Sequence, residues 1–315
     1  MAKPFIIGTF NSGEFLHAGQ KILNEGGTAI DAIVAATKQV EENPKDTSVG
    51  MGGIPNIFGV QEMDASIMCG KTLKAGAVGA IKGFRYPITV AEKVLEVAPH
   101  VLLVGAGAEF FGKAMGCELG DLSTDRSREV YQAFLDDALE ELPDDEAFKP
   151  YIIEYVQKQN LRKWYDRLAD DHHGTVNIMA MDSDGNMASA VSTSGTALKF
   201  PGRLGDSPII GAGNYCDNRH GAAACTGRGE LAIRASTART LVGYMENGMT
   251  LEEAAAQCMR DIHNLKTPGG MNCIAIDREG NTISATTRGD RESYHWYMDV
   301  DSKEPEKRIG INVPE

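Results

Sequence analysis

The segment from residue 199 to residue 239 carries the side chains best suited to hold a small anionic group. It contains six basic and three acidic residues, whereas the whole chain has a formal net charge of −13. These charged residues are Lys199, Arg203, Asp206, Asp217, Arg219, Arg228, Glu230, Arg234 and Arg239. A local positive excess in an acidic protein indicates a pocket for an anionic substrate group.

Arg203 and Asp206 form the most informative pair of charges in this segment. They stand three residues apart in the glycine-punctuated stretch GRLGDSP, residues 202–208. Such a pair can hold a zwitterion, with Arg203 binding a carboxylate through two parallel hydrogen bonds and Asp206 binding an ammonium group. The alternative is that the two side chains simply pair with each other at the surface. The residues alone leave both interpretations open.

Two threonines add possible catalytic groups. Thr226 and Gly227 offer a hydroxyl and an exposed backbone N–H before an expected helix, which can stabilise an oxyanion or can simply be the start of that helix. Thr175 follows Gly174 at the start of an expected strand, where most threonines are structural. A threonine exposed as a new N-terminus is different, because its α-amino group can act as the base for its own hydroxyl. One Gly-Thr dipeptide does not establish this.

Signals for a nucleotide or a metal ion are weak. Gly105 and Gly107 follow an expected strand, but Phe110 stands where a dinucleotide fingerprint needs a small residue, so a tight strand-to-helix turn is expected. Residues 170–173 (DDHH) group four potential ligands, but adjacent side chains point apart, and a solvated polar loop is expected. We therefore predict neither a cofactor nor a metal.

Composition excludes several classes of protein. With 315 residues, 42% hydrophobic and 24% charged, the chain has the composition of a soluble globular protein. Its negative charge disfavours nucleic acid and anionic membranes as partners. The short apolar run at residues 4–8 and the absence of a long apolar stretch lead us to expect a cytosolic protein. Six scattered cysteines without a C-x-x-C pair are expected to be reduced thiols.

The elements that must position these residues change character along the chain. The first half alternates short strands (5–10, 64–68, 100–104) with helices (14–24, 29–41, 90–97, 109–115). A charged stretch, 127–170, is expected to be helical, with a linker at 142–146. Two hairpins follow, 175–181 with 187–193 and 272–277 with 282–287, and two helices, 231–247 and 251–263. Antiparallel hairpins with helix pairs predict a layered α/β domain of the α+β class rather than a doubly wound parallel sheet.

Taken together, these segments resemble the glycosylasparaginase branch of the N-terminal-nucleophile hydrolases, whose relatives include plant-type asparaginases and isoaspartyl peptidases. The resemblance runs nearly end to end. The stretches that carry it are 26–32, 48–56, 64–68, 76–79, 174–175, 192–195, 202–208, 211–213 and 226–227. Their order and spacing make the resemblance specific.

The resemblance implies a single domain, a four-layer αββα sandwich, made as a precursor that cuts itself between Gly174 and Thr175 into an α subunit, 1–174, and a β subunit, 175–315. Thr175 would be nucleophile and general base, and Thr193 would tune it. Arg203 and Asp206 would bind the α-carboxylate and α-amino groups of an asparagine derivative, while the Thr226 hydroxyl and the Gly227 N–H would form the oxyanion hole. The resemblance implies no metal or organic cofactor, and a dimer of αβ units.

Departures from the branch bear on the substrate. Phe10 stands where glycosylasparaginases carry a tryptophan, so that a wall of the substrate pocket differs, and Gly174 replaces the usual aspartate before the nucleophile. Cys69 follows Met68 where the branch tends to have aspartate. We expect an amidase for GlcNAc-asparagine, with isoaspartyl peptidase or L-asparaginase activity as the alternative. A homologue that binds an amino acid without cutting itself is a remote third hypothesis.

Overall fold

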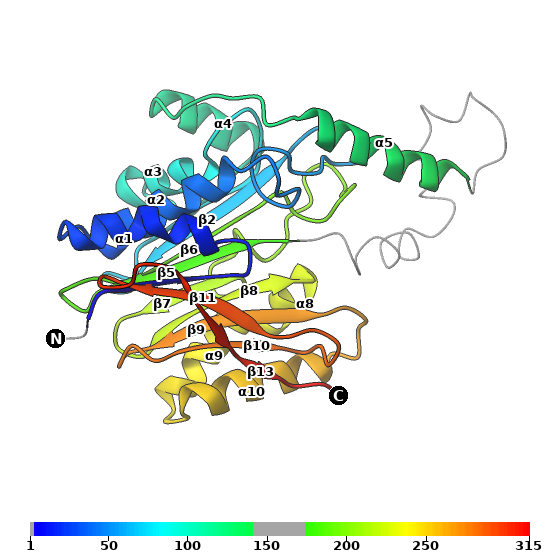
Figure 1. The fold of residues 1–315 in the computed structure, drawn as a ribbon. Coiled ribbons are helices and arrows are strands. Elements are labelled where there is room, and N and C mark those ends of the chain that lie inside the picture. The colour runs from blue at the N-terminus through cyan, green and yellow to red at the C-terminus, as the bar shows by residue number, and fades with distance from the viewer. Residues whose placement is uncertain (1–2, 141–173) are drawn as a thin grey trace.

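Two β-sheets lie face to face, and helices cover their outer sides (Figure 1). This computed structural model describes residues 3–140 and 174–315. The larger sheet has eight strands in the described part of the chain, with β5 and β6 near its centre. In spatial order they are β12 (Glu306–Ile309), β11 (Tyr294–Asp299), β1 (Phe5–Gly8), β5 (Val176–Met181), β6 (Met187–Thr193), β2 (Met63–Cys69), β3 (Ala75–Ile81) and β4 (Leu102–Val104).

The smaller sheet packs against the inner side of the larger one. Its five described strands are, in spatial order, β13 (Ile311–Asn312), β10 (Thr282–Thr286), β9 (Met271–Asp277), β8 (Gly221–Gly227) and β7 (Asn214–Asp217). Apolar side chains from both sheets form the cluster between them, including Ile7, Met179 and Val191 from the larger sheet and Ala224 and Ile274 from the smaller. The central strands of both sheets, such as β5, β6 and β8, are therefore buried on both faces.

Helices from the two halves of the chain cover opposite sides (Figure 1). Helices α1 (Leu16–Asn24), α2 (Ala29–Glu41), α3 (Pro87–Val97) and α4 (Gly105–Ala114) pack on the larger sheet, preceded by the short 3-10 helix η1 (Gly13–Phe15). Helices α8 (Gly229–Ala235), α9 (Thr237–Glu246) and α10 (Leu251–His263) pack on the smaller sheet. Helix α5 (Asp125–Glu140) runs away from the sheets in the view of Figure 1.

Local sequence signals explain several element boundaries. Capping boxes begin α2, between Thr28 and Asp31, and α10, between Thr250 and Glu253, and each box satisfies two backbone N–H groups at the start of its helix. In the β5–β6 hairpin, Asp182 Oδ1 accepts backbone N–H bonds from residues 184 and 186 and fixes the turn. This hairpin sets the first residue of β5 opposite the end of β6, because Val176 pairs with Ser192.

The mixed α+β class and the two hairpins are confirmed, but parts of the element prediction are wrong. The expected helix 231–247 is two helices, because Ser236 adopts a left-handed φ of 49° between α8 and α9. The strand β8 was not predicted, since its alanine-rich sequence has no alternating pattern and β-propensity is low for alanine and glycine. Strands β3, β7 and β11 to β13 were also missed. The expected linker at 142–146 lies outside the described residues.

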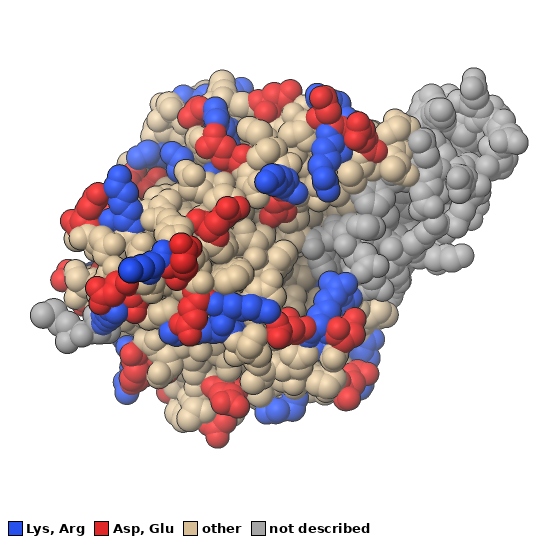
Figure 2. All heavy atoms as spheres, in the orientation of Figure 1, with Lys and Arg blue, Asp and Glu red and all other residues tan. Residues whose placement is uncertain are grey.

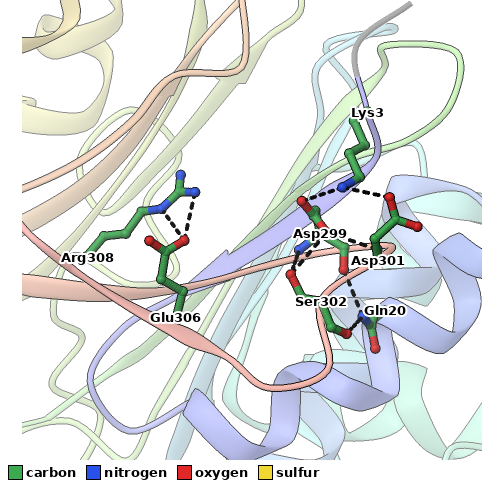
Figure 3. Close-up of polar contacts among 7 residues, drawn as sticks. All are labelled: Lys3, Gln20, Asp299, Asp301, Ser302, Glu306 and Arg308. Carbon is green, nitrogen blue, oxygen red and sulfur yellow. Dashed lines mark hydrogen bonds and ion pairs between the residues drawn. The ribbon is translucent and has the colours of Figure 1, made fainter.

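Lys3, just before β1, is bonded to the end of β11 and the turn that follows it (Figure 3). Lys3 Nζ lies 2.7 Å from Asp299 and 2.8 Å from Asp301, and Gln20 donates to the backbone carbonyls of Asp299 and Ser302 at 2.7 and 2.6 Å. These bonds hold β1, between β11 and β5, in the register Ile7 opposite Tyr297 and Met179.

Within the described residues, no helix combines the length and apolar character required to cross a bilayer.

A buried acid lies between α2 and the larger sheet. Glu41 is fully buried, and its Oε1 accepts hydrogen bonds from Ser192 Oγ at 2.6 Å and from the Ile88 N–H at 3.0 Å. Its Oε2 has no hydrogen-bond partner among the described residues. Desolvation raises the pKa of Glu41 to about 8, so the folded protein holds this carboxyl in its neutral form at neutral pH.

This acid predicts a pH-dependent stability. Glu41 has an unfolded-state pKa of about 4.5 and a folded-state pKa of about 8, so its stabilising contribution is full below pH 4.5 and is lost as the pH rises to 8. The loss at pH 8 is on the order of 4 kcal/mol. Glu41→Gln keeps a neutral side chain of the same shape, and at pH 8 its thermal unfolding midpoint should exceed that of the wild type by about 5 °C. The two midpoints should agree at pH 5. The exposed variant Glu25→Gln is the control, and identical midpoints of Glu41→Gln and wild type at pH 8 would contradict the assignment.

Candidate active site

Gly174 and two threonines meet where β5 begins and β6 ends. The Thr193 hydroxyl donates to the Gly174 carbonyl at 2.7 Å, and the Gly195 N–H donates to the same hydroxyl at 2.9 Å. Thr175 and Thr193 are both buried. The carbonyl between Gly174 and Thr175 is therefore polarised by a hydroxyl that is itself held in place by a backbone donor.

The backbone at Gly174 has no room for a side chain. A Cβ at this position would overlap Oγ and Cβ of Ser48. Ser48 cannot turn away freely, because Asp46 Oδ1 accepts its hydroxyl at 2.6 Å and its backbone N–H at 2.8 Å. Ser48 thus explains why glycine, rather than a larger residue, stands before Thr175.

Thr226 is tied to the same strand through Asn177. The Asn177 amide, two residues beyond Thr175, donates to Thr226 Oγ1 at 2.9 Å and to the Cys225 carbonyl at 3.0 Å. Asn177 is fully buried, and these bonds cross from the larger sheet to the smaller one. Gly227 has a φ of +131°, and a Cβ there would overlap the Gly270 carbonyl oxygen, so only glycine fits.

Arg203 and Asp206 lie in different environments. Arg203 donates from Nε and Nη2 to Glu230 Oε1 at 3.1 and 2.9 Å. Asp206 is only 4% exposed, and its Oδ2 has no hydrogen-bond partner among the described residues. Burial raises the pKa of Asp206 to about 7, a shift that the positive charge of Arg203 opposes. The alternative of a surface Arg–Asp pair is therefore wrong, because Asp206 is not at the surface.

Glycines bring these groups close together. A Cβ on Gly229 would lie 2.7 Å from Asp206 Oδ1, and one on Gly195 would lie 3.3 Å from Arg203 Nη1. Gly229 stands two residues after Gly227, and Gly195 binds Thr193. The predicted residues Thr175, Thr193, Arg203, Asp206, Thr226 and Gly227 thus converge on one region, although they come from both sheets.

Lys199 was not singled out as a positioning residue at the sequence level. Its side chain is buried, donates to the Glu62 carbonyl at 2.9 Å and lies 3.8 Å from Asp64 Oδ2. Desolvation lowers the pKa of Lys199, while the charge of Asp64 opposes that change. A Cβ on Gly195 would meet Lys199 Nζ at 2.9 Å, so this ammonium supports the turn after Thr193. The sequence did not indicate this role, because Lys199 stands among small and polar residues that show no helical or strand periodicity.

A cavity of about 610 Å³ opens beside Gly174. Ser48 and Asp46 line it, together with Phe10, which is 52% exposed, and Trp296. Trp296 Nε1 donates to the Phe10 carbonyl at 3.0 Å. The sequence predicted Phe10 as a pocket wall, but it did not predict the tryptophan that β11 places beside it, because the two are far apart in the chain.

The described residues show no metal-binding cluster. No three His, Cys, Asp or Glu side chains in 3–140 and 174–315 are grouped to hold an ion. Residues 170–173 lie outside the described part. Gly105 begins α4 directly after β4, and Phe110 is 77% exposed, which agrees with a strand-to-helix turn. All six cysteines are free thiols.

A family model described as asparaginase matches residues 12–304. The isoaspartyl peptidase/L-asparaginase of Mus musculus is 36% identical over 85% of the chain and 76% of the relative. The isoaspartyl peptidase of Escherichia coli is 38% identical over 84% and 78%, respectively. The N(4)-(beta-N-acetylglucosaminyl)-L-asparaginase of Elizabethkingia miricola is 34% identical over 88% and 77%.

The bridge between the sheets yields a stability prediction. Asn177→Ala removes two buried hydrogen bonds and leaves Thr226 Oγ1 without this donor, which should cost about 2–3 kcal/mol of stability. Asn264→Ala, at the exposed end of α10, should change stability by less than about 0.5 kcal/mol. Denaturant unfolding of both variants measures the difference. Equal stabilities would show that the bridge does not hold the sheets together.

Proposed function

The chain belongs to the asparaginase family of N-terminal-nucleophile hydrolases, and on that premise we propose that it cuts itself between Gly174 and Thr175 and then hydrolyses β-aspartyl peptides and asparagine. One observation carries this proposal: the Gly174 carbonyl accepts the Thr193 hydroxyl directly before β5, next to the groups expected to bind substrate. The fold we infer for this chemistry is the four-layer αββα sandwich of the family.

In the proposed self-cleavage, Thr175 Oγ attacks the Gly174 carbonyl carbon. The bond between this carbon and the Thr175 nitrogen breaks as the acyl group moves to oxygen, and water then hydrolyses the resulting ester. The products are the Gly174 carboxylate and a free Thr175 amine. The Thr193 hydroxyl supports the step, since its hydrogen bond to the Gly174 oxygen strengthens as negative charge develops there.

In the proposed turnover, the free Thr175 amine accepts the proton of its own hydroxyl. The Thr175 oxygen attacks the β-carbonyl of the substrate, the leaving amine takes a proton, and water releases aspartate from the β-aspartyl ester. The Thr226 hydroxyl and the Gly227 N–H bind the oxyanion. Arg203, oriented by Glu230, binds the α-carboxylate, and Asp206 binds the α-ammonium group.

The proposed order of substrates reverses the expectation from the sequence, which placed GlcNAc-asparagine first. The relatives named isoaspartyl peptidase, with or without L-asparaginase, support β-aspartyl peptides as the first choice. GlcNAc-asparagine is the second candidate, supported by the relative from Elizabethkingia miricola and by Trp296 beside Phe10, since aromatic faces can pack against sugar rings. The third hypothesis is a homologue that never cuts itself, and it predicts that the wild-type chain stays intact over time.

Self-cleavage should depend on the space beside Ser48. Thr175→Ala should leave one chain, because the nucleophile is gone. Gly174→Ala should slow cleavage at least tenfold, since its Cβ overlaps Ser48 and displaces the scissile carbonyl from Thr193. The double variant Gly174→Ala/Ser48→Gly should recover most of the rate. Denaturing electrophoresis over time reports fragments 1–174 and 175–315. A wild-type chain that stays intact would contradict the proposal, and a fast Gly174→Ala would contradict the steric argument.

Substrate affinity should depend on the ionisation of Asp206. Its raised pKa of about 7 means that the carboxylate needed to bind an ammonium group forms as the pH rises through 7 and is lost as the pH falls. The KM for a β-aspartyl dipeptide and for asparagine should therefore rise about tenfold from pH 7.5 to pH 6. Asp206→Asn should raise KM at pH 7.5 and remove this pH dependence. GlcNAc-asparagine completes the panel, and hydrolysis of it alone would contradict the proposed substrate class.

A further inference from the structure

The cavity beside Gly174 carries two charged side chains that the proposed mechanism does not use. Lys45 and Glu14 both line this space of about 610 Å³, and both are exposed. Within the described residues, neither side chain forms a hydrogen bond or an ion pair. Over the face shown in Figure 2, Lys and Arg side chains lie among Asp and Glu side chains. The cavity therefore offers an ammonium group and a carboxylate that have no charged partner of their own.

Asp46, the third charged residue of the cavity lining, is satisfied by neutral donors. Its Oδ1 accepts the Ser48 hydroxyl at 2.6 Å and the Ser48 N–H at 2.8 Å, and its Oδ2 accepts the Asn11 amide at 2.8 Å. These three bonds give the Asp46 carboxylate its partners without Lys45. Asp46 is thus part of the cavity wall, whereas Lys45 is available to a ligand.

Local hydrogen bonds hold the backbone at Lys45. Asn43 Oδ1 accepts the Lys45 N–H at 3.1 Å, and the Asn43 carbonyl accepts the Asp46 N–H at 3.3 Å. Such a turn is closed by its own side chain. Asp46 binds Ser48, and Ser48 lies against Gly174. The cation is therefore carried by a short turn that is connected to the residue before the proposed nucleophile.

Two lining residues connect the cavity to the proposed reaction. Gly174 lines the cavity, and its carbonyl accepts the Thr193 hydroxyl at 2.7 Å, directly before Thr175. Ser48 also lines the cavity, and its carbonyl lies 3.4 Å from the same Thr193 hydroxyl. The cavity thus begins at the carbonyl that Thr175 would attack during self-cleavage, one residue from the nucleophile of the proposed turnover.

We propose that this cavity binds the leaving residue of a β-aspartyl dipeptide, and that Lys45 binds the carboxylate of that residue. The inference rests on the proposed function, in which Arg203 and Asp206 hold the aspartyl half of the substrate. Neither of them lines the cavity, which leaves this space for the other half. The free carboxylate of the second residue is the anion that pairs with Lys45. Ammonia from asparagine and the amino sugar from GlcNAc-asparagine lack this group.

The other walls of the cavity set the side chain of the leaving residue. Phe10 and Trp296 supply an aromatic wall, which the hydrogen bond from Trp296 Nε1 to the Phe10 carbonyl at 3.0 Å holds together. Glu14 adds a negative charge that disfavours an acidic side chain. The best substrates are therefore β-aspartyl dipeptides that have a free C-terminal carboxylate and an apolar second residue.

Two substrates that differ in one carboxylate test the role of Lys45. β-Aspartyl-leucine carries the carboxylate, and β-aspartyl-leucinamide does not. Their leaving amines differ in basicity, so the quantity compared between variants is a selectivity ratio, kcat/KM for the acid divided by kcat/KM for the amide. Lys45→Gln should lower this ratio about two- to fivefold, mainly through KM, as expected for a partly exposed charge pair. High salt should lower the ratio of the wild type, because exposed charges are screened.

Two further variants control for effects other than charge. Glu14→Gln removes the anion from the same cavity and should raise the ratio, because it ends the repulsion of the substrate carboxylate. Lys113→Gln, an exposed lysine on α4, is the matched control and should keep the wild-type ratio. Both rate constants of a ratio come from one preparation, so the fraction of chains that have cut themselves cancels.

The outcomes distinguish the subsite from the proposed function. An equal ratio in the wild type and Lys45→Gln, or a ratio that falls in both Lys45→Gln and Glu14→Gln, would overturn the subsite and leave the hydrolase proposal intact. Hydrolysis of asparagine but of neither dipeptide would overturn the subsite and the proposed preference for β-aspartyl peptides. Hydrolysis of none of the three substrates would overturn the proposed function, and the subsite with it.

Discussion

The hydrogen bond from the Thr193 hydroxyl to the Gly174 carbonyl is the interaction on which the account of this protein depends. It exists because β5 and β6 are adjacent antiparallel strands, so the start of one lies beside the end of the other. It also requires a residue without Cβ at position 174, because Ser48 occupies the space that a side chain would need. A small change in register or in side-chain volume would remove it, which makes strand pairing a direct determinant of the proposed chemistry.

Buried polar groups fix the remaining geometry. Asn177 joins β5 to β8 and brings Thr226 to the start of the strand that Thr175 precedes. Lys199 fills the space behind Gly195, and Glu230 holds Arg203. Asn177 and Lys199 lose hydration because they are buried, and each recovers part of that loss through defined partners. Two buried oxygens here, Asp206 Oδ2 and Asn177 Oδ1, lack a hydrogen-bond partner among the described residues. In the proposed mechanism, a substrate ammonium group is the partner of Asp206.

The sequence predicted candidate site residues that the fold brings near one another, but it did not predict the residues around them. Arg203 and Asp206 could be recognised because two opposite charges on a glycine-rich loop form a local sequence pattern. Helices α2 and α10 begin at their predicted residues because capping boxes are also local patterns. Strand β8 was not predicted, because alanines that are buried on both faces of a sheet show no alternation of apolar and polar residues. A different reason explains why the sequence did not predict the roles of Asn177, Lys199 and Trp296. Each of these residues contacts partners far away in the chain, and no local sequence pattern indicates such a contact. Only the fold reveals that Trp296 lies beside Phe10.

The central claim is that Thr175 becomes the N-terminal residue and carries the acyl group during turnover. The most direct measurement is peptide mass spectrometry of the protein quenched in acid while it turns over a β-aspartyl dipeptide. The account predicts a peptide that begins at Thr175, in a fraction of which an aspartyl group is esterified to the threonine hydroxyl. Turnover by a chain still joined from Gly174 to Thr175, or an aspartyl group found only on another residue, would contradict it.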